Sequence, residues 1–375
     1  MHILHTVDNF YAELGGVAAC TYDLVAGLND IGCGSDTLSL SDGKHCLTGN
    51  GEHWMKLLPD DAKTPFRYSR AMKDFLEKET DYGLYHTNGL WLYCNHITAK
   101  VARKKKKPYV ISPHGMLYSK ALSRSSCRKK MITLLMFGKD LRHADCIHAT
   151  CRQELESVRR AGYSAPVAVI PNPVCMQMDG AFSMTDKGTG RLGFLGRLHP
   201  IKKIERLIRA FATLDRKDAE LIIMGSGDDE YEAYLRKEAL RLNLRNVVFT
   251  GFVAGREKYR LLSSLTALFV PGDFESFGMT VPEALMMKVP VMAGLDTPWE
   301  ELNTRQCGWW VANCEESIAV TMKKALSLSE QERKIMGENG RSLVLEHYTA
   351  DKIALKMKRL YDWILYGGEK PGFVY

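Results

Sequence analysis

Two glutamates in the second half of the chain have the residue type and spacing for chemistry. Glu275 and Glu283 stand in the stretch FESFGMTVPEALMMKVP with seven residues between them, and Gly278 lies in the gap. Pro282 suits the first turn of a helix, where the following carboxylate is favoured by about 0.3–1 kcal/mol. That effect explains Glu283 but not Glu275, which lies eight residues earlier in a loop. Two such carboxylates beside an anion-binding loop suit a ligand with a sugar, a diphosphate and a ribose.

Two basic residues follow a candidate strand earlier in the same half. Arg197 and Lys202 stand in GRLHPIKK, directly after the apolar run RLGFLG. An Arg and a Lys in one loop can neutralise the charge that grows on a departing nucleoside diphosphate. The alternative is a basic turn that only faces solvent.

Three further strand ends carry small or titratable residues. Gly15 and Gly16 open a predicted helix, where paired glycines let a backbone approach an anion or simply form a tight turn. His114 in SPHG is either a ligand group or a packed histidine. Gly225 in GSGDDE is expected to line a nucleotide base. Neither glycine motif has the GxGxxG spacing, so a nicotinamide dinucleotide is not indicated.

The elements that position these residues form two successive α/β patterns. A chain of 375 residues is too long for one core, so two domains are expected. Short apolar runs alternate with helical patterns, which predicts parallel sheets with ligands outside the carboxyl ends of the strands. We therefore expect two Rossmann-like, doubly wound parallel-sheet domains. In the first half the expected strands are 1–7, 35–40, 83–87, 108–112, 145–149 and 166–170, and in the second half they are RLGFLG, AELIIMG, NVVFTG, ALFVPG, PVMAG and GWWV.

Composition indicates a cytoplasmic protein. The N-terminal MHILHTV reads as a buried strand and lacks the basic region and cleavage site of a secretory signal. The ten cysteines are scattered and form no CxxC pair, so a structural zinc site is not expected and free thiols are.

Taken together, the motifs resemble a known enzyme family. ESFGMTVPEALMMKVPVM resembles the Glu-seven-Glu motif of the family-four retaining glycosyltransferases of the GT-B fold (glycosyl transferases group 1). FLGRLHPIKKIERLIRAF is similar to their Arg…Lys diphosphate motif. Similar motifs also occur at the corresponding places of that family for the segments LGGV, SPHG, HATCRQE, VIPNPV and TPWEELNTRQCGWWV. The resemblance covers nearly the whole chain. The wording of SPHGML, GRLHP and TPWEEL is similar to enzymes of bacterial capsule, O-antigen lipopolysaccharide and exopolysaccharide assembly.

The resemblance implies a domain plan. Residues 1–174 would form an acceptor-side domain, 175–190 a linker, and 191–349 the nucleotide-sugar donor domain, with a cleft between the domains. The C-terminal helix, about 350–375, would pack back on the first domain.

The resemblance also implies a role for each motif residue. Glu275 would contact hydroxyls of the donor sugar, and Glu283 the ribose hydroxyls. Arg197 and Lys202 would hold the diphosphate, and Gly15 and Gly16 would let it approach the first helix. His114 would line the sugar pocket. The other donor-site residues would be Phe277, Gly278 and Met279, through their backbone groups, and Gly225 and Val253 beside the nucleotide. Glu275, His114, Lys202 and Arg197 would be the catalytic residues.

Two departures from the family pattern stand out. Lys203 replaces the glycine that usually follows the motif lysine, and Pro271-Gly272 replaces the usual Pro-Ser. The sequence has no Asp-x-Asp triplet, so we expect no metal or other cofactor, with Arg197, Lys202 and a helix N-terminus in its place. The donor would be a UDP- or GDP-sugar, and the acceptor a hydroxyl of a lipid-linked glycan.

Positive charge is concentrated in one segment of the first half. Residues 103–142 hold twelve basic residues and one acid, a net charge of +11, whereas the whole chain carries +7. With the apolar run MITLLMF (131–137), this segment predicts peripheral attachment to the anionic inner face of the cytoplasmic membrane. A merely solvated face is the alternative, and nucleic acid is not indicated because no aromatic-interleaved motif is present.

Two other function classes stay open on the sequence. A GT-B nucleotide-sugar epimerase would use the same donor without an acceptor. A non-catalytic sugar-nucleotide-binding protein would keep the fold without turnover, although the intact set of Glu275, Glu283, Arg197 and Lys202 argues against it.

Overall fold

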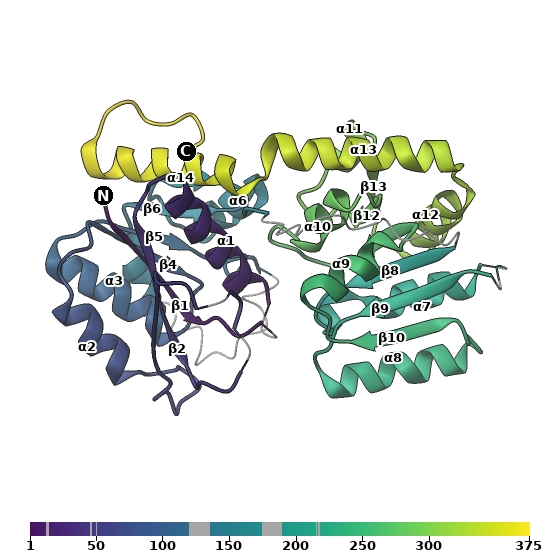
Figure 1. Cartoon of the computed structure of the whole chain (residues 1–375), viewed down its shortest axis with the longest axis horizontal. Helices are drawn as coiled ribbons and strands as arrows, with labels where there is room; N and C mark the ends of the chain where they lie inside the picture. The colour runs from purple at the N-terminus through teal and green to yellow at the C-terminus, as the bar shows by residue number, and fades with distance from the viewer. Residues whose placement is uncertain are drawn as a thin grey trace. The chain divides into compact units, whose positions relative to one another are not determined.

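The computed structural model describes residues 1–12, 15–45, 47–49, 51–119, 136–174, 190–214, 216 and 218–375. The chain divides into two compact units: Met1–Cys175 with Thr349–Tyr375 (unit 1), and Met176–Tyr348 (unit 2). Each unit is a β-sheet covered by helices (Figure 1). The linker predicted at 175–190 lies outside the described residues except for Gly190.

The sheet of unit 1 has seven parallel strands in the order β3-β2-β1-β4-β5-β6-β7. The order runs outward in both directions from β1, as in doubly wound folds. The strands are β1 (Ile3–Asn9), β2 (Ser35–Ser41), β3 (Met55–Pro59), β4 (Leu84–Asn88), β5 (Tyr109–Ser112), β6 (Cys146–Ala149) and β7 (Val167–Val169).

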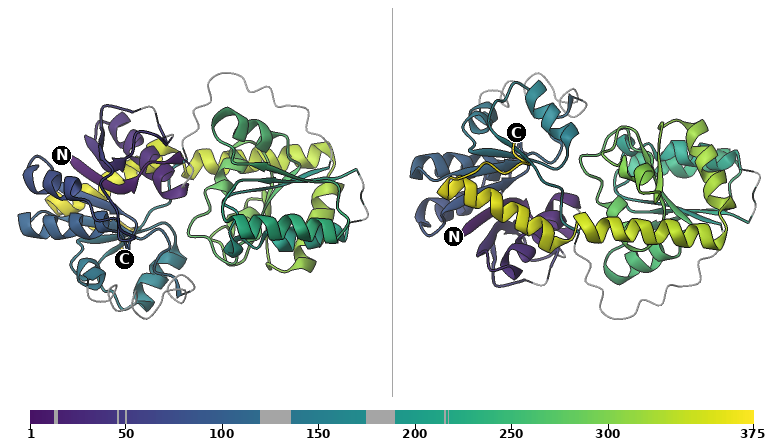
Figure 2. Two further views of the ribbon diagram at one scale, coloured as in Figure 1. Left: turned by 90° about the horizontal axis from the view of Figure 1, so that it is seen from below. Right: turned by 90° about the horizontal axis from the view of Figure 1, so that it is seen from above.

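Helices cover both faces of this sheet because successive side chains of a strand point to opposite sides (Figure 2). Ile3 of β1 joins the core beneath α1 and α14, and the next residue, Leu4, joins the core beneath α2 and α3. The helices are α1 (Gly16–Asp30), α2 (Arg70–Lys78), α3 (Tyr93–Lys105), α6 (Arg152–Arg160) and α14 (Ala350–Tyr366).

A chain of buried polar side chains crosses the core of unit 1. His86 contacts the Tyr361 hydroxyl through Nδ1 at 2.7 Å and Ser112 Oγ through Nε2 at 2.6 Å, and Ser112 Oγ lies 2.6 Å from Nδ1 of His148. His5 lies 3.3 Å from the same tyrosine hydroxyl. Burial lowers the pKa of His5 to about 3 and that of His148 to about 4, and it lowers the pKa of His86 well below its ordinary value. These histidines are therefore neutral in the folded protein.

The C-terminal residues complete the edge of the same sheet. The amide of Val167 donates to the carbonyl of Tyr375 at 3.0 Å, and the amide of Tyr375 donates to the carbonyl of Val167 at 2.8 Å. A third bond joins the Val169 amide to the Phe373 carbonyl at 2.9 Å. The backbone of β7 is thus paired on its outer side, which removes an open sheet edge.

Unit 2 contains a six-stranded parallel sheet in the order β10-β9-β8-β11-β12-β13. Its strands are β8 (Arg191–Leu195), β9 (Glu220–Met224), β10 (Val247–Gly251), β11 (Ala267–Val270), β12 (Val291–Gly294) and β13 (Gly308–Val311). Its helices are α7 (Ile204–Ala212), α8 (Asp229–Arg241), α9 (Gly255–Ser263), α10 (Thr280–Met286), α11 (Glu301–Thr304), α12 (Glu315–Ser327) and α13 (Glu330–His347), with the 3-10 turn η2 (Pro200–Lys202) before α7.

The predicted fold class, two doubly wound parallel-sheet domains, is confirmed. All six strands predicted in the second half are present, but the predicted strands of the first half omit β3. This strand is the edge of its sheet, and of Met55–Pro59 only Met55 is buried, with the charged Lys56 next to it. A half-exposed edge strand of this length lacks the continuous apolar run by which the other strands were predicted.

Candidate functional site

The loops after β8 and β9 pack together backbone to backbone. Leu198 donates its amide to the Ser226 carbonyl at 2.9 Å. A Cβ atom at Gly225 would lie 1.9 Å from the Gly196 carbonyl oxygen, and one at Gly227 would lie 2.2 Å from that of Leu198. Gly225 therefore has a packing role that demands glycine, while its predicted contact with a nucleotide stays a prediction.

This packing fixes the loop that carries Arg197 and Lys202. Arg197 is exposed just beyond the end of β8. The side chain of His199 accepts a hydrogen bond from the Ile201 amide at 3.2 Å and so begins the short turn that ends at Lys202. Lys203 then adopts a left-handed conformation with φ 52°. That conformation explains why a glycine suits this position, since glycine alone adopts it without steric cost.

Lys202 and Lys203 face different acids. The Lys202 ammonium donates to Oε1 of Glu275, and both side chains are largely covered. Lys203 Nζ lies 3.5 Å from Asp273, which also holds Arg206 at 2.6 Å. The structure therefore brings the first glutamate of the Glu-seven-Glu motif together with Lys202, the residue chosen as the motif lysine.

The second motif glutamate has a lysine partner of its own. Lys258 on α9 lies 3.1 Å from Oε1 of Glu283 in the first turns of α10, and both side chains are about four-fifths covered. Burial is the largest single effect on Lys258 and lowers its pKa, but the Glu283 carboxylate and Tyr259 together raise the pKa of this lysine above its ordinary value. Lys258 is absent from the predicted residues, because the sequence before α9 carries no motif that marks it.

The loop from β11 to α10, which carries Glu275, is held by residues from distant parts of unit 2. The Asn313 amide donates to the carbonyls of Pro271 and Gly272. The indole of Trp299 donates to the Phe277 carbonyl, and the two rings pack with centroids 5.1 Å apart. None of these contacts was predicted, because the partners lie 22 to 42 residues apart in the sequence.

The backbone turns at Gly278 and leads into the start of α10. Gly278 has φ 78°, and its carbonyl accepts the Val281 amide at 2.9 Å, which closes the turn into the helix. The first amides of a helix lack intrahelical acceptors and favour anions. Met279 precedes α10, and Val253 lies half-buried between β10 and α9; their contacts with a donor stay predictions.

The remaining predicted residues, Gly15, Gly16 and His114, belong to unit 1. Gly15 has φ 87°, and a Cβ atom on either glycine would meet no described atom within 4 Å. The start of α1 is therefore open enough for a ligand to approach the backbone. His114 adopts φ 48° and Gly115 φ 79°, so the turn after β5 is strained at the histidine.

Two side chains hold this turn. Nε2 of His114 lies 3.3 Å from Oδ1 of Asn88, whose Nδ2 faces the Thr6 carbonyl, so Nε2 carries the hydrogen. Glu154 is fully buried, accepts the Gly115 amide, and burial raises the pKa of its carboxyl. Burial lowers the pKa of His114 to about 3, so the ring is neutral, with Nδ1 as its hydrogen-bond acceptor.

Three residues of the basic segment 103–142 contact other residues of unit 1. Arg103 pairs with Asp140 at 2.6 Å, and Lys104 lies 3.5 Å from Glu77. Lys105 donates to backbone carbonyls at the end of α2. Residues 120–135, which hold five of the twelve basic residues and most of MITLLMF, lie outside the described residues.

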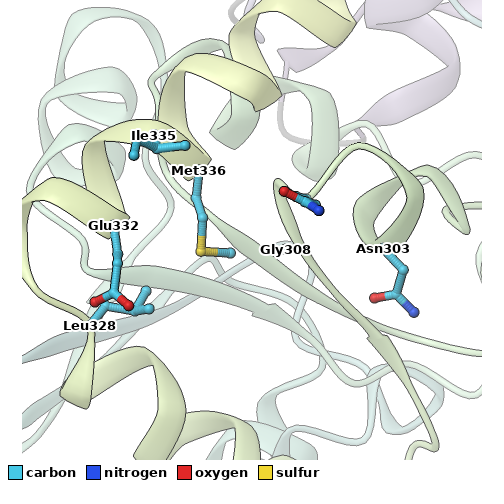
Figure 3. A pocket seen from close by; sticks show the side chains of 7 residues that line it. Asn303, Gly308, Leu328, Glu332, Ile335 and Met336 are labelled. Atoms are coloured by element: carbon cyan, nitrogen blue, oxygen red, sulfur yellow. The ribbon is translucent and has the colours of Figure 1, made fainter.

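Other features of the described residues lie apart from these motifs. A pocket of about 510 Å³ in unit 2 is lined by Glu332, Ile335 and Met336 of α13 with Asn303 and its neighbours, and it contains none of the predicted site residues (Figure 3). Within the described ranges, no group of three His, Cys, Asp or Glu could hold a metal ion. No helix in that part of the chain has the length and apolarity needed to span a membrane.

Two family models match the chain. The model "Glycosyl transferases group 1" matches residues 182–343, and the model "Glycosyl transferase 4-like domain" matches residues 15–173. The O-antigen chain mannosyltransferase C of Escherichia coli is 25% identical over 97% of this chain and 99% of that protein. An uncharacterized glycosyltransferase of Methanocaldococcus jannaschii is 34% identical over 45% of this chain, a match that spans 43% of the archaeal protein.

A solved structure has the same fold. The Anabaena protein HepE, determined in complex with UDP and glucose, superimposes with a TM-score of 0.78 over 96% of this chain and 99% of its own, at 18% identity. The two parallel-sheet units, the motif residues and these matches all point to the same family. The chain belongs to the group 1 glycosyltransferases and has the GT-B fold.

Proposed function

We propose that the protein transfers a sugar from a nucleoside-diphosphate sugar to a hydroxyl of a glycan, with retention of anomeric configuration. The contact between Lys202 and Glu275 carries the proposal. It joins two residues that follow the carboxyl ends of neighbouring strands β8 and β11, and we assign the diphosphate to Lys202 and the donor sugar to Glu275. Arg197 in the same loop as Lys202, and the amides at Gly278 and Met279, would supply further charge and donors for a diphosphate.

The second carboxylate extends the same site to the nucleoside. Glu283, held by Lys258, presents its remaining lone pairs as acceptors for paired ribose hydroxyls. In this arrangement the charge of the leaving diphosphate is offset by fixed side chains and a helix N-terminus, without a divalent metal. The HepE complex supports a nucleotide-linked donor. The E. coli relative supports a hexose as the transferred sugar, and mannose is the first candidate.

The acceptor is proposed from the same relative. O-antigen assembly by the E. coli protein supports a polysaccharide hydroxyl on a lipid-linked carrier as the acceptor. The charge of residues 103–142 supports attachment to an anionic membrane surface, where such a carrier is embedded.

Release of nucleoside diphosphate from a panel of UDP- and GDP-sugars tests the proposal. We expect turnover with one nucleotide sugar that depends on a glycan acceptor, persists with EDTA, and yields the anomer of the donor by NMR. Interconversion of the nucleotide sugar without an acceptor would identify an epimerase instead. Donor binding without any turnover would identify a non-catalytic binding protein.

A further inference from the structure

In this structure the ammonium group of Lys202, which a bound diphosphate would need, is already paired with the carboxylate of Glu275. The Lys202 side chain is 22% exposed and that of Glu275 is 13% exposed, so the two charges face each other more than they face water. Lys203 next to it faces Asp273 and is not a substitute. A lysine already paired with a carboxylate offsets less of the charge on a second anion, and the carboxylate itself repels that anion.

We propose that Glu275 competes with the nucleoside diphosphate for Lys202 and thereby loosens the site's hold on the product after the sugar has left. The inference rests on the proposed function and adds a role to a residue expected only to bind sugar. With the complete donor bound, sugar hydroxyls donate to Glu275 and satisfy its oxygens, so Lys202 is available to the diphosphate. Once the sugar is transferred, those hydroxyl donors are gone and the ion pair between Glu275 and Lys202 forms again.

The two glutamates should therefore have opposite effects on binding of a free nucleoside diphosphate. Glu283 is proposed to hold the ribose, so its removal weakens binding. Glu275 opposes binding, so its removal strengthens it. The two residues have the same chemistry and each has a lysine partner, which makes Glu283→Gln a matched comparison for Glu275→Gln.

Isothermal titration with UDP and GDP tests the inference. We expect Glu275→Gln to tighten binding of the preferred nucleoside diphosphate by about tenfold, the scale of one charge interaction in a partly exposed site. Glu315→Gln, which removes the same charge from an exposed pair with Arg209 on α7 and α12, should bind like the wild type. In a Lys202→Ala background, Glu275→Gln should gain clearly less than it does with Lys202 present, because only the direct repulsion by the carboxylate is left to relieve.

Three results would overturn the inference: unchanged or weaker binding by Glu275→Gln, an equal gain by Glu315→Gln, or a full tenfold gain in the Lys202→Ala background. Glu275→Ala provides a second variant, and thermal unfolding of each variant identifies any that fails to fold. If the wild-type protein binds no nucleoside diphosphate, the proposed function fails. If it binds one and Glu275→Gln does not tighten that binding, the inference alone fails.

Discussion

Lys258 Nζ lies 3.1 Å from Oε1 of Glu283, and the pair joins α9 to the first turns of α10. The pKa of Lys258 is raised above its ordinary value, so this lysine is charged at neutral pH. The pair holds Glu283 in one orientation, as the proposed binding of two adjacent ribose hydroxyls would require.

Glu283→Gln should weaken binding of the free nucleoside diphosphate by about ten- to a hundredfold, the scale of a lost hydrogen bond to a charged group. Lys258→Met should lower the melting temperature, because it leaves a half-buried carboxylate without its cation. Titration calorimetry and thermal unfolding measure the two effects. Wild-type affinity in Glu283→Gln would remove its assignment to the ribose.

Lys202 and Lys203 should respond differently to substitution. Lys202→Ala should slow turnover by roughly 10²–10³-fold, as expected when one group that stabilises transition-state charge is removed. Lys203→Gly should keep most of the activity, since glycine suits the φ of 52° at this position. Steady-state rates of both variants decide the matter. A crippled Lys203→Gly beside an active Lys202→Ala would show that the motif lysine has been assigned to the wrong residue.

Asn88 should control the protonation of His114. Asn88→Asp puts a carboxylate where the amide oxygen lies 3.3 Å from Nε2, so the pKa of His114 should rise from about 3 toward its ordinary value of 6.5. Histidine NMR titration measures the shift, and Asn88→Ala serves as the control that changes packing without adding charge. An unshifted His114 in Asn88→Asp would contradict the contact.

The buried histidines should make the protein sensitive to mild acid. The unfolded chain takes up protons near pH 6.5, whereas His5, His114 and His148 in the folded state do so only near pH 3 to 4. The free energy of unfolding therefore falls as the pH drops below 6.5, by about 1.4 kcal/mol per pH unit for each fully buried histidine. Urea unfolding at pH 7, 6 and 5 measures the slope. His148→Gln should reduce it, and an unchanged slope would argue against the neutral network.

Attachment to anionic membranes should depend on only part of the basic segment. Lys105 donates to backbone carbonyls at the end of α2, so replacing it with Ala should affect stability more than binding. Replacing Lys106, Lys107, Lys129 and Lys130 should weaken flotation with anionic vesicles, by about 1 kcal/mol for each lysine near the surface. Added salt should weaken it too. If the wild-type protein does not float with anionic vesicles at low salt, the proposed membrane attachment is wrong and a soluble acceptor is favoured.

The sequence predicts the fold more fully than the contacts within the site. Buried central strands such as β9 and β11 are continuous apolar runs, and these are visible without any partner. The edge strand β3 has no such run. The motif glutamates stand out by their spacing, but Lys258, Asn313 and Trp299 act on them from other segments, and the sequence does not reveal which segments meet. The pairing of Lys202 with Glu275 likewise depends on how the loops after β8 and β11 are packed.

The return of the chain to unit 1 has a consequence for synthesis on the ribosome. Residues 349–375 supply α14, with Tyr361 in the histidine network, and the segment that pairs with β7, yet they are made after all of unit 2. At 5–20 residues per second, roughly 10–40 s separate the end of the first sheet from the helix that covers it. Unit 2 is contiguous, and the whole of it is synthesised in that interval. The unit that is begun first is thus the one completed last, and until then its α1 face and the edge of β7 are exposed to chaperones and to other chains.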